Sequence, residues 1–276
     1  MGAAASGSSS KSSASDPSTH PPSADSLKAS WVDRQFPPAG GNVVDVIRQT
    51  GWLYSAGGEC HYLALHARGC SKKDADRAIE KGHLVEVKAV RGCTMLLPRE
   101  DAKVRDLPSL AERFLRWAAP ATLAEFAWWA GVTQKAARSA FDQAPTTVRP
   151  TRAKIVFLPV RDNYLYFRRD AAIFADAAHR DVALLDWENR PTTLSKLHAI
   201  HNHAIVESGR LIGVWDYDPE TREVVWATFG AAPKGLAGEV AALKETIERE
   251  YGRVRIYHAD RGAALKGRLA AIRKMR

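Results

Sequence analysis

The chain has 276 residues, a formal net charge of +9 and 45% hydrophobic residues. This length suits two or three compact units rather than one small core, and the hydrophobic share is sufficient for most of the chain to fold. The excess of basic residues favours a polyanionic partner. No apolar run reaches the roughly eighteen residues that a membrane span needs, so no membrane partner is expected.

Cysteine usage points to a reducing compartment. The three cysteines, Cys60, Cys70 and Cys93, show no paired spacing and cannot all form internal disulfides. The N-terminus also lacks the apolar core of a secretory signal. We therefore expect a cytoplasmic protein, associated with the nucleoid if its source is bacterial.

The first thirty residues form a serine-rich tail. Residues 1–30 contain many serines, several prolines and almost no large apolar side chains. Such a segment cannot bury enough apolar surface to offset the entropy lost on ordering. The sequence therefore predicts that residues 1–30 are disordered.

Two helices are predicted in the next segment. Trp31 opens the folded part, and a turn rich in proline and glycine follows at residues 37–41. Apolar residues recur at helical spacing from Val43 to Arg48, and a second apolar helix is predicted around Tyr62. Together with the segment that follows, these helices make a first winged-helix domain over residues 31–105.

Residues 71–99 combine a short helix with a basic β-hairpin. Ser71 stands at the N-cap position, and Gly82 lies where the helix would stop. Apolar and charged residues then alternate over residues 85–89, and Arg91-Gly92 supply a turn before a return strand. This pattern is typical of a winged-helix nucleic-acid module whose hairpin is the wing. The alternative is an ordinary helix and hairpin with a solvated basic face.

Basic side chains on this unit make contacts to phosphates physically available. The candidate nucleic-acid-binding residues are Lys72, Lys73, Lys88 and Arg91, with Arg99 beside them. The C-terminal stretch 253–276 is also strongly basic, and it either lies on DNA or forms a solvated, partly frayed tail. Double-stranded DNA is the predicted partner.

From Leu110 the pattern returns to helix. Leu110, Phe114 and Trp117 form one apolar stripe. Thr122 is a good N-cap for the next helix, and Glu125 three residues later completes a capping box. Two consecutive helices are therefore predicted here.

Gly131 interrupts the second of these helices, and residues 133–141 form another short helix after a tight turn. This arrangement is typical of a helix-turn-helix and defines a second domain over residues 106–150. Its last helix has a polar side whose side chains are suited to phosphates or base edges. These side chains are Gln134, Lys135 and Arg138. The alternative is a helical hairpin in a structural subdomain.

Strand signals dominate residues 151–276, the predicted third domain. The predicted elements are strands at 154–160, 163–167, 204–206, 211–215 and 224–229, an amphipathic helix at 235–251, a last strand at 254–257 and a basic helix at 263–275. The expected fold class is therefore α+β. Tandem winged-helix or helix-turn-helix domains are followed by an antiparallel, β-rich α+β domain with a basic terminal helix.

Few motifs of known chemistry are present. The sequence contains no Walker loop, dinucleotide-binding fingerprint, nucleophile elbow or paired-cysteine motif, so no cofactor is expected. His198, His201 and His203 lie close together, but only the first two have one-turn helical spacing and no carboxylate or cysteine brackets them, so no metal site is predicted. Asp162 follows a strand, where a carboxylate acts as a general base or pairs with Arg161 or Arg168.

Three segments have the order and spacing of a known family. They are LVEVKAVRGCTMLLPRED, FLPVRDNYLYFRRD and HAIVESGRLIGVWDYDPETREVVWATF. They resemble the wing, the Leu-Pro-x-x-Asp stretch and the Gly-Arg turn with Gly-x-Trp of the AlkZ/YcaQ-like family of winged-helix DNA glycosylases. The resemblance covers residues 40–250. It implies tandem winged helices joined to a β-rich domain around a DNA channel.

The catalytic motif of that family is not apparent. Active members carry Gln-x-Gln or Gln-x-Asp after the first helix, where polar side chains place the hydrolytic water beside the sugar. The nearest positions by spacing hold Tyr54 and Ala56, and neither side chain can replace a water-positioning carboxamide or carboxylate. The wing departs from the pattern as well, with Cys93 for Thr and Met95 for His. The resemblance therefore transfers fold and DNA binding better than catalysis.

Three hypotheses follow from the sequence. The first is a DNA-binding protein of glycosylase-like architecture that recognises damaged or alkylated DNA. The second is a divergent DNA N-glycosylase acting on alkylated or crosslinked bases, for which the candidate catalytic residues are Asp162, Glu59 and His61. The third is a scaffold in which the winged helices bind protein partners.

Overall fold

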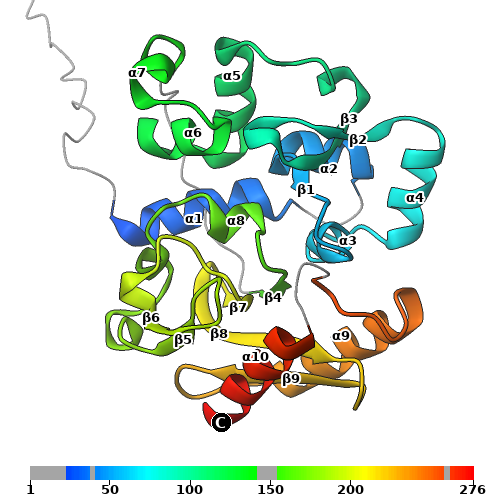
Figure 1. Ribbon diagram of the computed structural model, residues 1–276, viewed down its shortest axis with the longest axis vertical. Helices are drawn as coiled ribbons and strands as arrows, with labels where there is room; N and C mark the ends of the chain where they lie inside the picture. The colour runs from blue at the N-terminus through cyan, green and yellow to red at the C-terminus, as the bar shows by residue number, and fades with distance from the viewer. Residues whose placement is uncertain (1–22, 38–40, 142–153, 258–261) are drawn as a thin grey trace, which may run out of the picture.

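The computed structural model describes residues 23–37, 41–141, 154–257 and 262–276 (Figure 1). Within these ranges the chain combines helices with antiparallel sheets, which confirms the expected α+β class. The helices are α1 (Ala24–Gln35), α2 (Val43–Thr50), α3 (Cys60–His66), α4 (Lys72–Glu80), α5 (Leu107–Ala118), α6 (Leu123–Ala130), α7 (Gln134–Ala137), α8 (Asn163–Tyr166), α9 (Leu236–Glu250) and α10 (Gly262–Lys274). The described helices include none that is long and apolar enough to cross a membrane.

The strands form two larger sheets and one hairpin. They are β1 (Leu53–Tyr54), β2 (Leu84–Lys88), β3 (Thr94–Pro98), β4 (Ile155–Leu158), β5 (Ala183–Leu185), β6 (Pro191–Thr193), β7 (His203–Glu207), β8 (Arg210–Asp218) and β9 (Glu223–Thr228). The sheet orders are β1-β3-β2, β4-β7-β8-β9 and β5-β6. In Figure 1 the helical part with the first sheet lies above the β-rich part, and α1, α3 and α8 lie between them.

The helix and hairpin predicted at residues 71–99 are present. Ser71 caps α4, because its hydroxyl accepts the N–H of Asp74 at 3.1 Å. Strands β2 and β3 pair in antiparallel register from Leu84 opposite Pro98 onward, and β1 pairs with the other edge of β3. The turn of the hairpin uses positive φ values, +66° at Gly92 and +56° at Arg91, where glycine is the residue best suited.

The helices predicted after residue 106 are also present. Thr122 and Glu125 form the predicted capping box at the start of α6. Gly131 ends α6 in the left-handed conformation, with φ +77°, and α7 follows directly. Leu110 and Phe114 of the predicted stripe are buried.

One hydrophobic core is shared by elements on both sides of the predicted boundary at residue 105. It includes Ile47 of α2, Leu97 of β3, Phe114 of α5 and Trp129 of α6. Phe167, which lies after the predicted boundary at residue 150, also belongs to it. The helical part therefore packs as one body, and the division into domains stays a prediction.

The four-stranded sheet is buried on both faces. Ala204 and Val206 of β7 belong to one core together with Leu265 of α10, whereas Ile205 between them belongs to another core together with Leu243 of α9. Alternate residues of a strand point to opposite faces, so α10 and α9 cover opposite faces of this sheet. The core that contains Ile205 and Leu243 also includes residues of α3. Helix α3 therefore packs against the β-rich part.

Residues 163–167 were predicted to be extended, and this prediction is wrong. Residues 163–166 form α8, and the carboxylate of Asp162 caps it by accepting the N–H of Tyr164 at 2.9 Å. The aromatic residues suggested a strand because they favour half-buried sheet surfaces. The cap and the burial of Tyr164 outweigh that preference.

The predicted strand at residues 254–257 is also wrong. This segment makes only an isolated antiparallel bridge, between Tyr257 and Gly58, and the carbonyl of Ile256 accepts the N–H of Glu59 at 3.1 Å. The segment thus pairs with the loop before α3 instead of joining the four-stranded sheet.

The predicted disordered tail overlaps α1, which begins at Ala24, so the expectation is wrong for residues 24–30. Residues 1–22 lie outside the described ranges. Trp31 anchors α1, because its indole N–H donates to the carbonyl of Pro120 at 2.9 Å and its ring centroid lies 5.6 Å from that of Phe174. These contacts reach both the helical part and the β-rich part. They could not be predicted from local sequence, because Pro120 and Phe174 lie far from Trp31 along the chain.

Candidate nucleic-acid interface

The predicted wing is packed against the helix pair that follows it. The guanidinium carbon of Arg91 lies 4.5 Å from the ring centroid of Trp128 in α6. A Cβ on Gly131 would lie 2.9 Å from Cγ of Arg91, so only glycine leaves room for this contact. Arg91 and Lys88 are both exposed, and Lys88 makes no ion pair within the described ranges. The β2–β3 hairpin therefore has a fixed base and two exposed cations.

The two lysines of α4 differ in availability. The ammonium of Lys72 lies 2.6 Å from the carboxylate of Asp76 and 4.5 Å from the ring centroid of Tyr62. Lys73 is exposed and makes no ion pair with any described residue. Lys73 can therefore contact an external phosphate at lower cost than Lys72, whose charge is already paired.

The polar side chains of the second helix pair are exposed as predicted. Gln134, Lys135 and Arg138 lie on the solvent side of α7 and the turn after it, whereas Ala137 is buried. In Figure 1, α7 and α4 lie at opposite ends of the helical part. The structure therefore does not bring the α7 side chains together with the lysines of α4.

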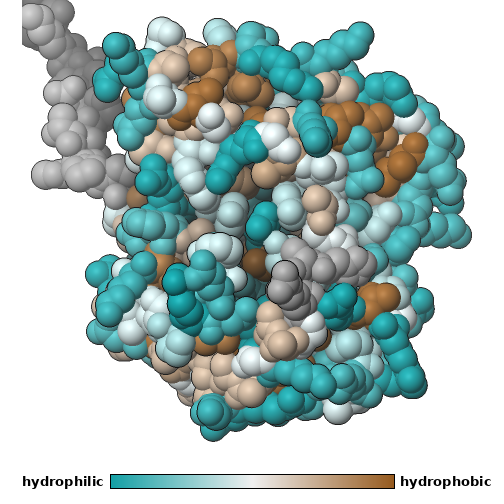
Figure 2. All heavy atoms as spheres, in the orientation of Figure 1, coloured by the Kyte–Doolittle hydropathy of each residue, from teal (hydrophilic) through white to brown (hydrophobic). Residues whose placement is uncertain are grey.

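The face shown in Figure 2 carries hydrophilic residues over both the helical part and the β-rich part. Two arginines of the basic C-terminal helix are paired within the protein. Arg268 of α10 is buried and lies 2.9 Å from Asp216, and Arg273 lies 3.0 Å from Asp218. The carboxylates of β8 thus neutralise these two cations, and the burial of Leu269 shows that α10 packs on the sheet, so the prediction of a frayed tail is wrong for this helix. Lys274 is exposed and makes no ion pair with a described residue, and contact of this stretch with DNA stays a prediction.

Asp162, a candidate catalytic residue, is held in a buried ion pair. Its two oxygens lie 2.7 Å and 3.0 Å from the guanidinium nitrogens of Arg68, not beside Arg161 or Arg168 as the sequence suggested. One of these oxygens also accepts the N–H of Tyr164. The carboxylate is therefore occupied by structural contacts.

Glu59 and His61, the other two candidates, lie at the start of α3. Oε2 of Glu59 and Nδ1 of His61 are buried and make no hydrogen bond to any described residue. The His61 ring centroid lies 4.0 Å from that of Tyr62, and burial lowers the pKa of His61 below its usual value. His61 is buried, whereas Glu59 is half-buried with one buried carboxylate oxygen.

Of the two positions nearest to the family's catalytic pair, Tyr54 contacts an arginine, whereas Ala56 is exposed. The guanidinium carbon of Arg161 lies 4.4 Å from the ring centroid of Tyr54, 5.6 Å from that of Tyr257 and 5.9 Å from that of Tyr166. Arg161 has φ +67°, in the left-handed region. From the sequence, Arg161 was expected only as a partner for Asp162. The tyrosine cage was not predicted, because its rings come from distant segments of the chain.

A cavity of about 270 Å³ opens beside this cage. Its lining comes from the β4–α8 turn, the β5–β6 turn, the start of β7, the segment before residue 258 and α10. The lining residues are Val160, Arg161, Asp186, Trp187, Asn189, His201, His203, Tyr257 and Arg268. Two of the three closely spaced histidines line it, and no group of three metal-ligating side chains with the geometry of a metal site occurs among the described residues. Trp187 was not among the predicted site residues, because the β5–β6 hairpin that carries it was not predicted.

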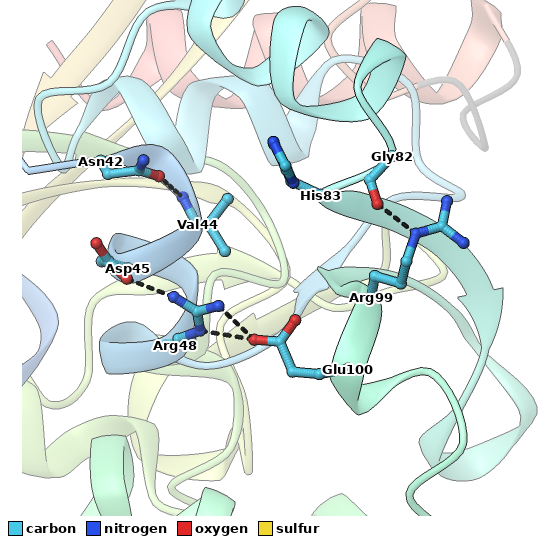
Figure 3. Close-up of a pocket in the computed structure, with 8 residues that line it drawn as sticks. All are labelled: Asn42, Val44, Asp45, Arg48, Gly82, His83, Arg99 and Glu100. Carbon is cyan, nitrogen blue, oxygen red and sulfur yellow. Dashed lines mark hydrogen bonds and ion pairs between the residues drawn. The ribbon is translucent and has the colours of Figure 1, made fainter.

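A second cavity, of about 430 Å³, lies against the helical part (Figure 3). Its lining includes Arg48, Arg99 and His83. The guanidinium of Arg48 forms ion pairs with the carboxylates of Asp45 and Glu100, each with a nitrogen–oxygen distance of 2.5 Å. Nε of Arg99 donates a hydrogen bond to the carbonyl of Gly82. The positive charge of Arg48 is therefore compensated by carboxylates within the protein.

Comparison with known proteins identifies the fold. No protein-family model matches the chain, and no curated protein matches it. Among solved structures, the chain is similar to the Streptomyces sahachiroi DNA glycosylase AlkZ, with a TM-score of 0.58 and 14% sequence identity. The match covers 84% of this chain and 97% of that chain. The protein described here therefore has an AlkZ-like fold.

Proposed function

We propose that the protein binds double-stranded DNA, recognises damaged or alkylated sites and does not release bases. The observation that carries this proposal is the AlkZ-like fold over 84% of the chain, combined with Tyr54 and Ala56 at the positions nearest to the catalytic pair of that family. The neighbour is named as a DNA glycosylase. A protein that keeps such a scaffold without the water-positioning pair retains the means to bind DNA but not to hydrolyse a glycosidic bond.

The binding part of the proposal rests on exposed cations. Lys73, Lys88 and Arg91 on the helix and wing are exposed, and Lys135 and Arg138 are exposed at α7. Phosphate contacts from such side chains release counterions and supply sequence-independent affinity. In this proposal the β2–β3 hairpin is the wing of a winged helix, and α6 with α7 forms a helix-turn-helix.

The loss of catalysis rests on the state of the candidate residues. The Asp162 carboxylate is paired with Arg68, and the Tyr54 ring carries the Arg161 guanidinium on its face. Neither group can hold a water molecule as a general base.

A second candidate function is a divergent N-glycosylase. Oε2 of Glu59 and Nδ1 of His61 favour it, since both atoms are buried without a hydrogen-bond partner among the described residues. Unsatisfied buried polar atoms often mark a catalytic or ligand-bound site. This candidate predicts abasic product from alkylated duplexes, whereas the first predicts retention alone.

The test of DNA binding is fluorescence anisotropy with a labelled duplex at a series of salt concentrations. We expect the logarithm of the association constant to fall linearly with the logarithm of salt concentration, with a slope of about −0.9 for each phosphate neutralised. A tighter complex with a duplex carrying N7-alkylated guanine than with the unmodified duplex supports damage recognition. Absence of binding at low salt contradicts the proposal and favours a protein-interaction scaffold.

A further inference from the structure

The cavity beside the tyrosine cage is lined by an arginine, Arg161, that forms no ion pair with any described residue. Arg161 lies at its wall, partly buried, and its guanidinium makes no hydrogen bond or ion pair with any residue that the structure describes. Its neighbours there are aromatic rings, those of Tyr54, Tyr166 and Tyr257. These rings hold the guanidinium in place through cation–π contacts and leave its N–H groups available for an external acceptor.

The acidic residue in the cavity wall is not that acceptor. Oδ1 of Asp186 accepts the N–H groups of Glu188 and Arg190, at 2.8 Å and 2.9 Å, and Oδ2 accepts Nε of Arg190 at 2.8 Å. Asp186 therefore closes its own turn between β5 and β6. The positive charge of Arg161 remains uncompensated within the described part of the chain and suits a phosphate.

The same turn presents an aromatic ring. Trp187 is 69% exposed, and it is the exposed large hydrophobic side chain among the described residues. The hydrogen bonds of Asp186 hold the backbone of the turn on either side of Trp187, which lines the cavity. An exposed indole beside an unpaired guanidinium offers a stacking surface for one base next to a site for its phosphate.

The remaining polar lining is suited to the edge of a base. Asn189 supplies an amide with both donors and an acceptor. Burial and the nearby charge of Arg161 lower the pKa of His201, so its imidazole is neutral and offers one donor and one acceptor. The volume of about 270 Å³ lies at the small end of ligand pockets, where a single nucleotide fits and a duplex does not.

We propose that this cavity binds one unstacked nucleotide, with its phosphate on Arg161 and its base against Trp187. The nucleotide comes either from an unpaired position in DNA, which rests on the proposed function, or from a free nucleoside monophosphate. Both sources share the same chemistry, a planar base joined to an anionic phosphate. Stacking on the indole and pairing with the guanidinium each favour the unstacked form over a base inside a duplex.

The test uses 2-aminopurine, whose fluorescence falls when it stacks. Three probes are titrated with the full chain: a duplex with one unpaired 2-aminopurine nucleotide, the same duplex with that base paired to thymine, and the free 2-aminopurine nucleoside monophosphate. We expect the unpaired duplex to bind about tenfold more tightly than the paired duplex and to lose fluorescence on binding.

Variants assign the effect to the cavity. Trp187→Ala removes the preference for the unpaired duplex and the fluorescence change, whereas Trp187→Phe keeps part of both because it retains a ring. Arg161→Gln removes the preference, and Arg161→Lys retains part of it. Lys234→Gln, which removes an exposed cation that does not line the cavity, leaves the ratio of the two affinities unchanged. Since Trp187 is exposed, its variants test the idea even if Arg161→Gln fails to fold.

The outcomes separate this proposal from the proposed function. Equal binding of both duplexes, together with no binding of the monophosphate, overturns the nucleotide site and leaves DNA binding intact. A preference that persists in Trp187→Ala and Arg161→Gln also overturns it. Binding of the monophosphate alone, lost in Trp187→Ala, supports the nucleotide site and contradicts the proposed function.

Discussion

The guanidinium of Arg68 and the carboxylate of Asp162 form an ion pair in which neither side chain has exposed surface. Arg68 follows α3, and Asp162 caps α8, so the pair joins two segments that are far apart in the sequence. The second guanidinium nitrogen of Arg68 also donates to Oε1 of Gln35 at 2.6 Å. The pair therefore connects α1, α3 and α8 between the two parts of the molecule.

We predict that Asp162→Asn destabilises the protein by about 3–5 kcal/mol, because Arg68 would remain buried without a counter-charge. Urea unfolding followed by circular dichroism measures the loss. The double variant Arg68→Met/Asp162→Leu should cost less, since no unpaired charge remains. A single variant as stable as the wild type would show that the pair does not hold the segments together.

Stability should also depend on pH through buried histidines. Burial lowers the pKa of His61 in the folded protein, so the unfolded chain binds more protons below its own value of about 6.5. The free energy of unfolding should be flat above this pH and fall as the pH drops through it. His61→Phe should reduce the slope below pH 6.5 by up to about 1.4 kcal/mol per pH unit. An unchanged slope would exclude His61 as a contributor.

The contact between Arg91 and Gly131 predicts a specific glycine requirement. Gly131→Ala would place a Cβ 3.1 Å from Cα of Arg91 at a φ of +77°, so we expect a loss of about 1–2 kcal/mol in stability. The matched control is Gly267→Ala in α10, where a Cβ meets no atom within 4 Å and helix propensity should add about 0.5–1 kcal/mol. Thermal melting of both variants measures the difference. A Gly131→Ala variant at least as stable as the wild type would contradict the packing of the β2–β3 hairpin on α6.

For the DNA interface, Lys88→Gln tests the wing. If Lys88 contacts a phosphate, its loss should weaken binding similarly for all duplex sequences and reduce the salt slope by about 1. Lys266→Gln is the control, because Lys266 lies on α10 and is paired with Glu220 at 3.3 Å. Anisotropy titrations at several salt concentrations give both slopes. The same slope for Lys88→Gln and the wild type would move the interface away from the wing.

Local signals made much of the fold predictable. The cap at Ser71, the capping box of Thr122 and Glu125, and the turn at Gly92 each determine a helix end or a hairpin within a few residues, and all are present. The features that were not predicted depend on distant partners. Helix α1 is stabilised by Trp31 against Pro120, and α8 replaces a predicted strand because Asp162 caps it while paired with Arg68.

The candidate site was less predictable than the fold for the same reason. The resemblance indicated from the sequence alone that Tyr54 is one of the two positions nearest to the family's catalytic pair. The environment of Tyr54 depends on Arg161, Tyr166 and Tyr257, which meet only in the folded chain. The exposure of Trp187 likewise depends on a hairpin that has no strong turn signal.

The most direct test of the central claim is incubation of the purified protein with a duplex carrying N7-alkylated guanine, scored for gel retention and for alkali-labile abasic sites. We predict retention of the duplex with no abasic product above the spontaneous background. Glu59→Gln and His61→Phe should leave that result unchanged. Enzyme-dependent abasic product that disappears in either variant would contradict the account and establish a glycosylase with a different catalytic site.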